Sequence, residues 1–224
     1  MRANTIVMAM LLLGSLACAV DTPVSAPPLP PGVCEFCDRD RSTTAPNLVS
    51  TPLLSPAERP RLSLDHILTR HDGTDLRLSD AIGRPLAIAF VYTRCANQLK
   101  CPLAASTMER LRQRVVATGL EAQVRLFLVT FDPEYDTPEV MTAYARERGL
   151  VLGAGLGFLR PRPEEKEGFF AALRVPISFA QDGVAIHGVH LLLVDRLGRL
   201  AREHRIVVWD NDTVLGDLTA LARE

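Results

Sequence analysis

The chain has 224 residues, of which 47% are hydrophobic and 23% are charged, a composition typical of one globular domain with a sizeable core. Twenty-five basic residues against 26 acidic residues leave a formal net charge of -1. This balance gives no support to nucleic acid or an anionic membrane surface as a partner.

Residues 1–19 have the pattern of a secretory signal peptide: a basic start, an apolar run over residues 6–13, and small residues in GSLACAV. The apolar run is too short for a comfortable membrane span. Two kinds of processing fit the sequence, cleavage after Ala19 or lipidation of Cys18 in a lipobox-like segment, and a retained anchor is a third. Each predicts an exported protein of a bacterial periplasm or cell envelope, a compartment in which disulfides can persist. Any membrane attachment would be only through the N-terminal anchor.

Residues 20–59 are predicted to form a linker, because this stretch holds most of the early prolines. Proline-rich segments favour extended, semi-rigid conformations and bury no core. Cys34 and Cys37 lie within this linker in the sequence CEFC, which fits either a second metal or redox station or a small local disulfide. The folded domain is therefore expected to span residues 60–224.

The predicted elements of that domain begin with an alternating segment at residues 61–68, a turn in HDGTD and a short segment closed by Gly-x-Pro. The continuous apolar runs PLAIAFVYT (85–93) and QVRLFLVTF (123–131) predict two buried strands. A helix is expected between them, ending near Gly119, and a second helix from Pro138 to Gly149 with Thr137 as its N-cap.

The remaining elements are a helix in residues 161–174, a hairpin in residues 189–207 that turns at Asp195–Gly198, and a last helix capped by Asp212. Early alternation of strands and helices followed by a hairpin predicts an α/β fold with a mixed sheet covered by helices on both faces. A thioredoxin-like architecture has this order of elements.

Cys95 and Cys101 occur in YTRCANQLKCP, directly after the first buried strand. Ligand sites in open α/β sheets collect at the carboxyl ends of strands. Pro102 suits an early helical position, so the second thiol is expected near a helix amino terminus, which favours thiolate. A structural disulfide, a redox dithiol and a soft-metal site all fit this pair.

A metal site needs at least one further ligand, and AIHGVHLLLVD supplies two candidates, His187 and His190. We expect His187 in a loop and His190 within a strand. Residues three apart in a strand face opposite sides, so at most one of the two should point toward the cysteines. Two thiolates and one imidazole form a set that suits copper, since sulfur selects Cu(I) and imidazole also accepts Cu(II).

Several blocks together resemble the Sco/SenC family of thioredoxin-fold copper proteins over residues 60–224. AFVYTRC…CP is similar to the family's strand and cysteine motif, VTFDPEYDTPEVMTAYARERG resembles its S-x-D-P-x-x-D-T-P-x-x-L-x-x-Y block, and HLLLVDRLGRL resembles its late hairpin. The family's metal histidine stands eight residues before the aspartate of that hairpin, which corresponds to His187. The resemblance implies that Cys95, Cys101 and His187 are the metal ligands and that Cys95 and Cys101 are also the redox pair.

Two positions depart from the family pattern. The usual Cys-x-x-x-Cys is Cys-x-x-x-x-x-Cys here, and Ile186 replaces the aspartate that commonly precedes the histidine. The two added residues can bulge outward and leave the sulfurs close, or they can separate them. Within the matched block, Asp132 and Asp136 are expected to act chiefly in turns or caps.

The function that the resemblance implies is delivery of copper to the CuA centre of cytochrome c oxidase, or reduction of the cysteines of that centre. The partners would be the CuA-bearing subunit or its assembly factors and a thioredoxin-like reductant. The resemblance thus favours a metallochaperone over an enzyme, with thiol–disulfide reductase activity as a further role. Two alternatives remain: a thiol–disulfide oxidoreductase without copper, and a non-catalytic envelope domain with a structural disulfide. A thiol peroxidase would want Thr-x-x-Cys, whereas Thr93 stands only two residues before Cys95.

Overall fold

The computed structural model describes residues 49–180, 183–205 and 208–224. The predicted signal peptide and the residues Cys18, Cys34 and Cys37 lie outside these ranges. The described chain forms a mixed eight-stranded sheet and a separate two-stranded sheet, β7-β8. None of the described helices is long and apolar enough to cross a membrane.

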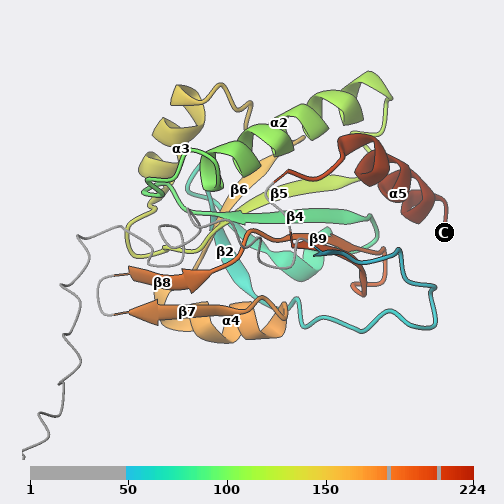
Figure 1. The fold of residues 1–224 in the computed structure, drawn as a ribbon, viewed down its shortest axis with the longest axis horizontal. Coiled ribbons are helices and arrows are strands. Elements are labelled where there is room, and N and C mark those ends of the chain that lie inside the picture. The colour runs from blue at the N-terminus through green and yellow to red at the C-terminus, as the bar shows by residue number, and fades with distance from the viewer. Residues whose placement is uncertain (1–48, 181–182, 206–207) are drawn as a thin grey trace, which may run out of the picture.

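The strands of the large sheet lie in the order β1-β10-β9-β4-β5-β6-β2-β3 (Figure 1). Their bounds are β1 Val49–Ser50, β2 Ile67–Arg70, β3 Asp75–Arg77, β4 Leu86–Val91, β5 Arg125–Thr130, β6 Gly157–Pro161, β9 Leu191–Val194 and β10 Leu200–Arg205. The small sheet pairs β7 Ile177–Ala180 with β8 Gly183–His187. The helices are α2 Cys101–Ala117, α3 Pro138–Glu147, α4 Lys166–Ala172 and α5 Asn211–Arg223, with 3₁₀ turns at Leu78–Ala81 and Pro163–Glu165.

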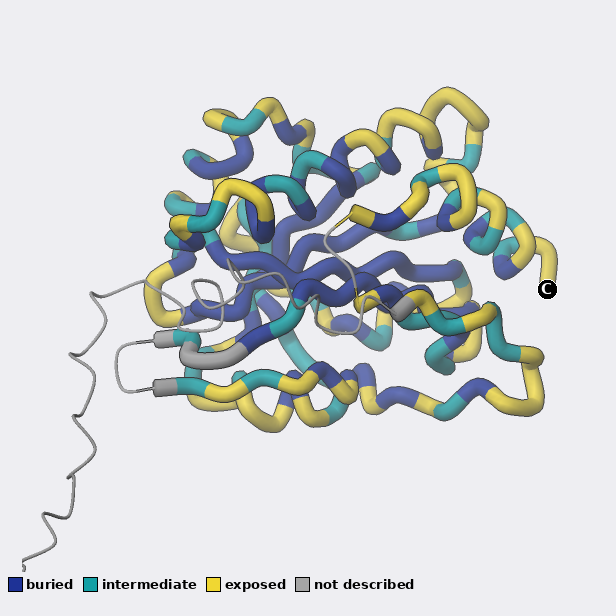
Figure 2. Tube along the Cα trace, in the orientation of Figure 1, coloured by how far each residue is buried: buried dark blue, intermediate teal, exposed yellow. Residues whose placement is uncertain are grey.

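Strand β4 is the centre of the domain, because all six of its residues are buried. It runs parallel to β5 and antiparallel to β9, and β5 runs parallel to β6. Helices cover both faces of the sheet: α2 and α5 pack on one face and α4 lies on the other (Figure 1). The burial pattern in Figure 2 follows this arrangement, with buried central strands and exposed outer helix faces. The predicted mixed sheet between helices is therefore confirmed.

Four strands were missed by the sequence analysis, namely β1 in the predicted linker, β6, β7 and β8. Strand β6 is short, begins at Gly157 and ends at Pro161, and so resembles a loop in sequence. A Cβ at Gly157 would lie 2.9 Å from a ring carbon of Phe127, so glycine allows β6 to approach β5 closely. The hairpin of β7 and β8 is the element that carries His187.

Two further expectations are wrong. The last helix is capped by Asp210, whose carboxylate accepts hydrogen bonds from the backbone N–H groups of Asp212 and Thr213. His190 precedes β9 and does not lie within it, whereas His187 is the last residue of β8. For the last helix and for β9 the sequence pattern identifies the element and misplaces its boundary by a few residues, whereas the loop expected at His187 is the end of a strand.

The end of the predicted linker is attached to the domain. Val49 pairs with Arg205 on β10, and the backbone N–H of Leu54 donates to the carbonyl of Ala201. The side chain of Arg59 is 2% exposed and contacts both the carboxylate of Asp195, at 3.2 Å, and that of Glu224. Residues 49–59 therefore join the late hairpin to the carboxyl-terminal helix.

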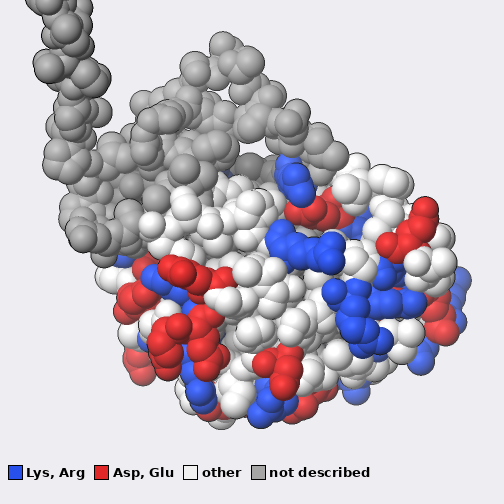
Figure 3. Space-filling model, turned by 90° about the horizontal axis from the view of Figure 1, so that it is seen from below, with Lys and Arg blue, Asp and Glu red and all other residues white. Residues whose placement is uncertain are grey.

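Charges of both signs occur on the face shown in Figure 3, with uncharged areas between them. This mixed surface agrees with the formal net charge of -1.

Replacing Arg59 by methionine should lower the free energy of unfolding by about 3 kcal/mol, because the change leaves the buried Asp195 carboxylate without one of its cations. Urea denaturation of the two proteins at neutral pH measures this difference. The matched control is Arg61→Met, because Arg61 is exposed and makes only a long 3.4 Å contact with the carbonyl of Leu197. Equal stabilities of the two variants would contradict a structural role for the Arg59 side chain.

Candidate metal centre

Both thiols lie at the carboxyl end of β4, as the sequence predicts. Cys101 is the first residue of α2 and is fully buried, and Pro102 follows it in the first helical turn. Cys95 lies on the loop between β4 and α2 and is 4% exposed. The amino terminus of α2 places the partial positive charge of the helix near the Cys101 sulfur.

The segment between β4 and α2 contains two tight turns, one that ends at Cys95 and one between the two cysteines. The backbone N–H of Cys95 donates to the carbonyl of Tyr92, and that of Lys100 donates to the carbonyl of Asn97. The side-chain oxygen of Asn97 accepts from the N–H of Leu99, and the Cys95 thiol lies 3.7 Å from the Asn97 carbonyl oxygen. The added residues of the wide cysteine spacing thus form a turn whose Leu99 side chain is 73% exposed.

His187 reaches the site from the small sheet. Its Nε2 atom lies 3.9 Å from the Cys101 sulfur, and the histidine is 2% exposed. The rings of Tyr92 and Phe131 pack against its imidazole, with ring centroids 5.2 Å and 5.0 Å away. These two aromatic residues follow β4 and β5, so the ends of both central strands fix the position of the imidazole. Sequence analysis did not identify either ring as part of the site.

The structure brings Cys101 and His187 together, but it does not gather all three predicted ligands around one point. Among the described residues, no group of three His, Cys, Asp or Glu side chains is close enough to hold one metal ion.

Asp136 connects the loop that carries Cys95 to the end of β5. Its fully buried carboxyl group accepts hydrogen bonds from the backbone N–H of Thr93, at 3.1 Å, and from the hydroxyl groups of Thr93 and Thr130. Burial raises the pKa of Asp136 to about 6, although these hydrogen bonds act in the opposite direction. Asp136 is thus a buried connection between two loops, and not a simple turn residue.

Asp132 makes a second connection to the same loop. Its carboxylate is 2% exposed and accepts from Nε and Nη2 of Arg94, at 2.9 Å and 2.6 Å. The Arg94 guanidinium also lies 4.3 Å above the centre of the Tyr135 ring. The residue directly before Cys95 is therefore attached to the turn that follows β5. The sequence analysis expected Asp132 to act chiefly in a turn. In the structure its carboxylate also forms the ion pair that joins the turn to the Cys95 loop.

The His190 ring packs against Gly188, the residue directly after His187. Its Nδ1 atom lies 2.8 Å from a carboxylate oxygen of Glu203 on β10, and both residues are largely buried. Burial favours a higher pKa for Glu203, but hydrogen bonds with His190 and Arg205 outweigh it and lower this pKa to about 2. A Cβ at Gly188 would lie 2.7 Å from the His190 Nε2 atom. Glycine at position 188 is therefore required for this close approach.

The raised pKa of Asp136 predicts a pH effect on stability. The carboxyl group binds its proton more tightly in the folded protein, near pH 6, than in the unfolded chain, where the ordinary pKa is 3.8. Its contribution is therefore fully present below about pH 4, falls as the pH rises to 6, and is then constant.

In Asp136→Asn the amide can donate to the Thr93 hydroxyl and its oxygen can accept the other two hydrogen bonds. We expect the stability of the variant relative to the natural protein to rise by about 3 kcal/mol between pH 4 and pH 7. Urea denaturation across this range measures the difference. A stability difference that does not change with pH would contradict a buried carboxyl group that titrates near pH 6.

Comparison with known proteins gives the family of the chain. The SCO1/SenC family model matches residues 55–221. No curated protein sequence matches the chain significantly.

Solved structures share the fold at low sequence identity. BsSco, described as a Sco-family cytochrome c oxidase assembly protein with a disulfide switch, is 19% identical, with a TM-score of 0.65 over 76% of this chain and 98% of its own. A SCO1/SenC family lipoprotein from Bacillus anthracis is 20% identical, with a TM-score of 0.64 over 75% of this chain and 99% of its own. Copper-bound ScoI from Bradyrhizobium japonicum is 23% identical, with a TM-score of 0.55 over 70% and 96%.

These structures confirm the thioredoxin-like architecture. The family model covers most of the chain and includes the loop of Cys95 and Cys101, the DPEYDTP block and the histidine hairpin. The chain belongs to the SCO1/SenC family.

Proposed function

We propose that the protein is an exported copper carrier that binds one Cu(I) ion through Cys95, Cys101 and His187. The observation that carries the proposal is the buried contact of 3.9 Å between the Cys101 sulfur and His187 Nε2, with a second buried thiol on the adjoining loop. Thiolate and imidazole ligands suit copper, and the low polarity of the aromatic surroundings protects Cu(I) from water.

Copper is the cargo in this proposal. Binding requires both thiols to lose their protons, so copper loading releases two protons and is coupled to pH. Solved family members from B. japonicum, Arabidopsis thaliana and yeast are described as copper-bound, which supports copper as the metal. Copper binding would have to draw the three ligands around one ion, because no such group of three is present among the described residues.

The client that we propose is the CuA site of cytochrome c oxidase, reached directly or through assembly factors. In the alternative role at the same client, Cys95 and Cys101 reduce a disulfide between the client's copper-binding cysteines. The client disulfide gains two electrons and two protons, and the two thiols become a disulfide that no longer holds copper. A thioredoxin-like reductant then restores the thiols. The disulfide switch described for BsSco supports this second role as an alternative.

Export and anchoring form part of the same proposal. We infer that residues 1–19 direct export, and that lipidation of Cys18 attaches the chain to the membrane through the linker. The B. anthracis family member is described as a lipoprotein, which supports this route. Mass spectrometry of the mature protein tests it: a lipid attached to Cys18 supports anchoring, whereas a free amino terminus after Ala19 supports simple cleavage.

The main test is copper stoichiometry under anaerobic, reducing conditions. Protein that begins after residue 19, with Cys34 and Cys37 replaced by serine, should bind about one Cu(I). Cys95→Ala and Cys101→Ala should each abolish tight binding, and His187→Ala should weaken it about 10- to 100-fold. The matched histidine control is His71→Ala, since His71 contacts the backbone of Phe158 and does not contact the thiols.

Two results would contradict the carrier role. A core domain that binds no copper but is oxidised and reduced by thioredoxin-like partners would support the oxidoreductase alternative. A domain that shows neither property would support a structural disulfide between Cys95 and Cys101.

A second prediction concerns the residues that follow His187. In Gly188→Ala the new methyl group would collide with His190, whose ring is held by Glu203. The segment that carries His187 must then shift, and the affinity for Cu(I) should fall about tenfold. Competition with a chromophoric Cu(I) chelator measures this affinity. The control is Gly168→Ala in α4, where an added Cβ meets nothing within 4 Å. Equal affinities of the two variants would show that His190 does not position the metal ligand.

A further inference from the structure

A cavity of about 540 Å³ lies near the amino-terminal ends of β4 and β5, away from the thiols. This volume lies within the range of small-molecule sites. Part of its wall is apolar, from Leu76, Ala81 and Phe127, and the loop that contains Gly153 closes one side. The charged side chains that line it are Arg70, Arg125, Asp72 and Asp80.

Arg125 is the central cation of this cavity. It is the first residue of β5, and its backbone N–H donates to the carbonyl of Pro85, so Arg84 lies near it on the segment that leads into β4. Arg125 and Arg84 have no ion pair with a carboxylate in the described part of the chain. Burial, followed by the nearby charges of Arg84 and Arg70, lowers the pKa of Arg125. Like charges are thus held close together at this end of the sheet.

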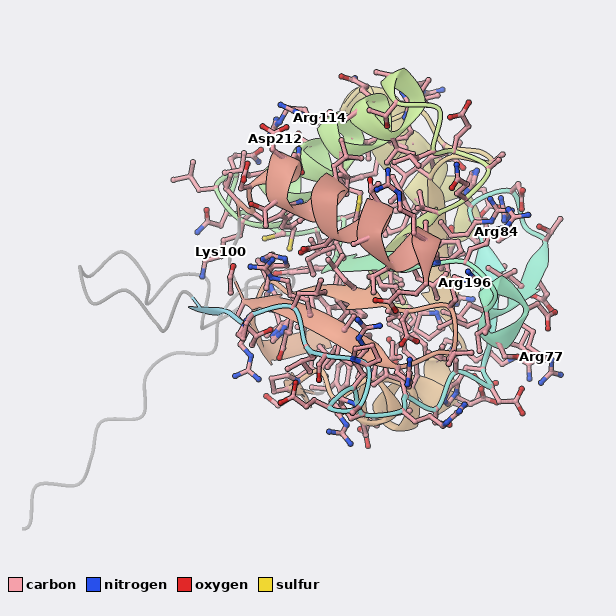
Figure 4. All side chains as sticks on the ribbon, turned by 90° about the vertical axis from the view of Figure 1, so that its right-hand side faces the viewer. Arg77, Arg84, Lys100, Arg114, Arg196 and Asp212 are labelled. Carbon is pink, nitrogen blue, oxygen red and sulfur yellow. The ribbon has the colours of Figure 1, made fainter. Side chains whose placement is uncertain are left out.

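Arg196 adds a further cation to the same edge. Its carbonyl accepts a hydrogen bond of 3.0 Å from the backbone N–H of Gly83, so the hairpin turn lies directly beside Arg84. Figure 4 shows Arg84 and Arg196 together on one side of the molecule and Lys100, the N-cap of α2, on the opposite side. The six residues of β4 separate these two ends by about 20 Å.

The two carboxylates of the cavity do not neutralise this cluster. Asp72 accepts hydrogen bonds from the backbone and hydroxyl of Thr74 and lies 3.5 Å from Arg70, so its charge is already shared. Asp80 is exposed, and its one negative charge is too little to balance the two positive charges of Arg84 and Arg125. An additional anion in the cavity would therefore be attracted to the arginine cluster, with Asp80 opposing it.

We propose that this cavity binds a small organic anion. Arg125 would hold its carboxylate or phosphate group, the neighbouring Arg84 would add positive charge, and Leu76 and Phe127 would contact its apolar part. The planar guanidinium group matches both anionic groups through paired hydrogen bonds. The site is separate from the copper ligands, so an anion bound here leaves the thiols accessible.

The test uses citrate and inorganic phosphate as separate probes, in a low-salt buffer without other multivalent anions. Calorimetric titration of the reduced protein should give saturable one-to-one binding of at least one of the two, and the stronger probe identifies the preferred group. Arg125→Gln and Arg84→Gln should each weaken binding about tenfold. Asp80→Asn should strengthen it severalfold, because the opposing charge is removed.

The control is Arg146→Gln, which lies at a neighbouring cavity and should leave the affinity for both anions unchanged. Circular dichroism and Cu(I) binding of each variant show that its fold and its thiol site are intact. The proposal is overturned if neither anion saturates the protein up to about 10 mM, the range of very weak binding. It is also overturned if Arg125→Gln and Arg146→Gln bind the anions equally.

Discussion

The buried carboxyl group of Asp136 is the interaction on which the geometry of the site depends. It accepts hydrogen bonds from Thr93, after β4, and from Thr130, at the end of β5, and thereby joins the ends of the two central strands. The Arg94–Asp132 ion pair adds a second connection between the same loops. Because Cys95 directly follows Thr93 and Arg94, its backbone is held at the carboxyl end of the sheet.

The three proposed ligands come from different kinds of element. Cys101 begins a long helix, and the rings of Tyr92 and Phe131 pack against the imidazole of His187. Cys95 lies on a loop whose Leu99 side chain is exposed. The proposed carrier and reductase roles both require the Cys95 and Cys101 sulfurs to lie close together, either on one copper ion or in a disulfide. The length of the loop between the two cysteines gives it room to adjust to either state.

The sequence was sufficient to predict the mixed sheet, the buried strands of residues 86–91 and 125–130, the Thr137 cap and the late hairpin, because each follows from local apolar runs or capping residues. It also identified the contact between Cys101 and His187, through the family resemblance. It did not predict the role of Asp136 or the His190–Glu203 pair, because partners on different strands meet only once the strand register is known. The histidine hairpin was missed because its strands are short and contain polar residues.

X-ray absorption spectroscopy of the Cu(I)-loaded domain, with Cys34 and Cys37 replaced, tests the central claim most directly. The proposed site predicts a copper shell of two sulfur atoms and one imidazole nitrogen, with the nitrogen lost in His187→Ala and one sulfur lost in Cys95→Ala. A natural protein whose copper shell contains one sulfur atom, or sulfur atoms without imidazole, would show that the loop does not bring Cys95 to Cys101 and His187. Such a result would contradict the account of the site given above.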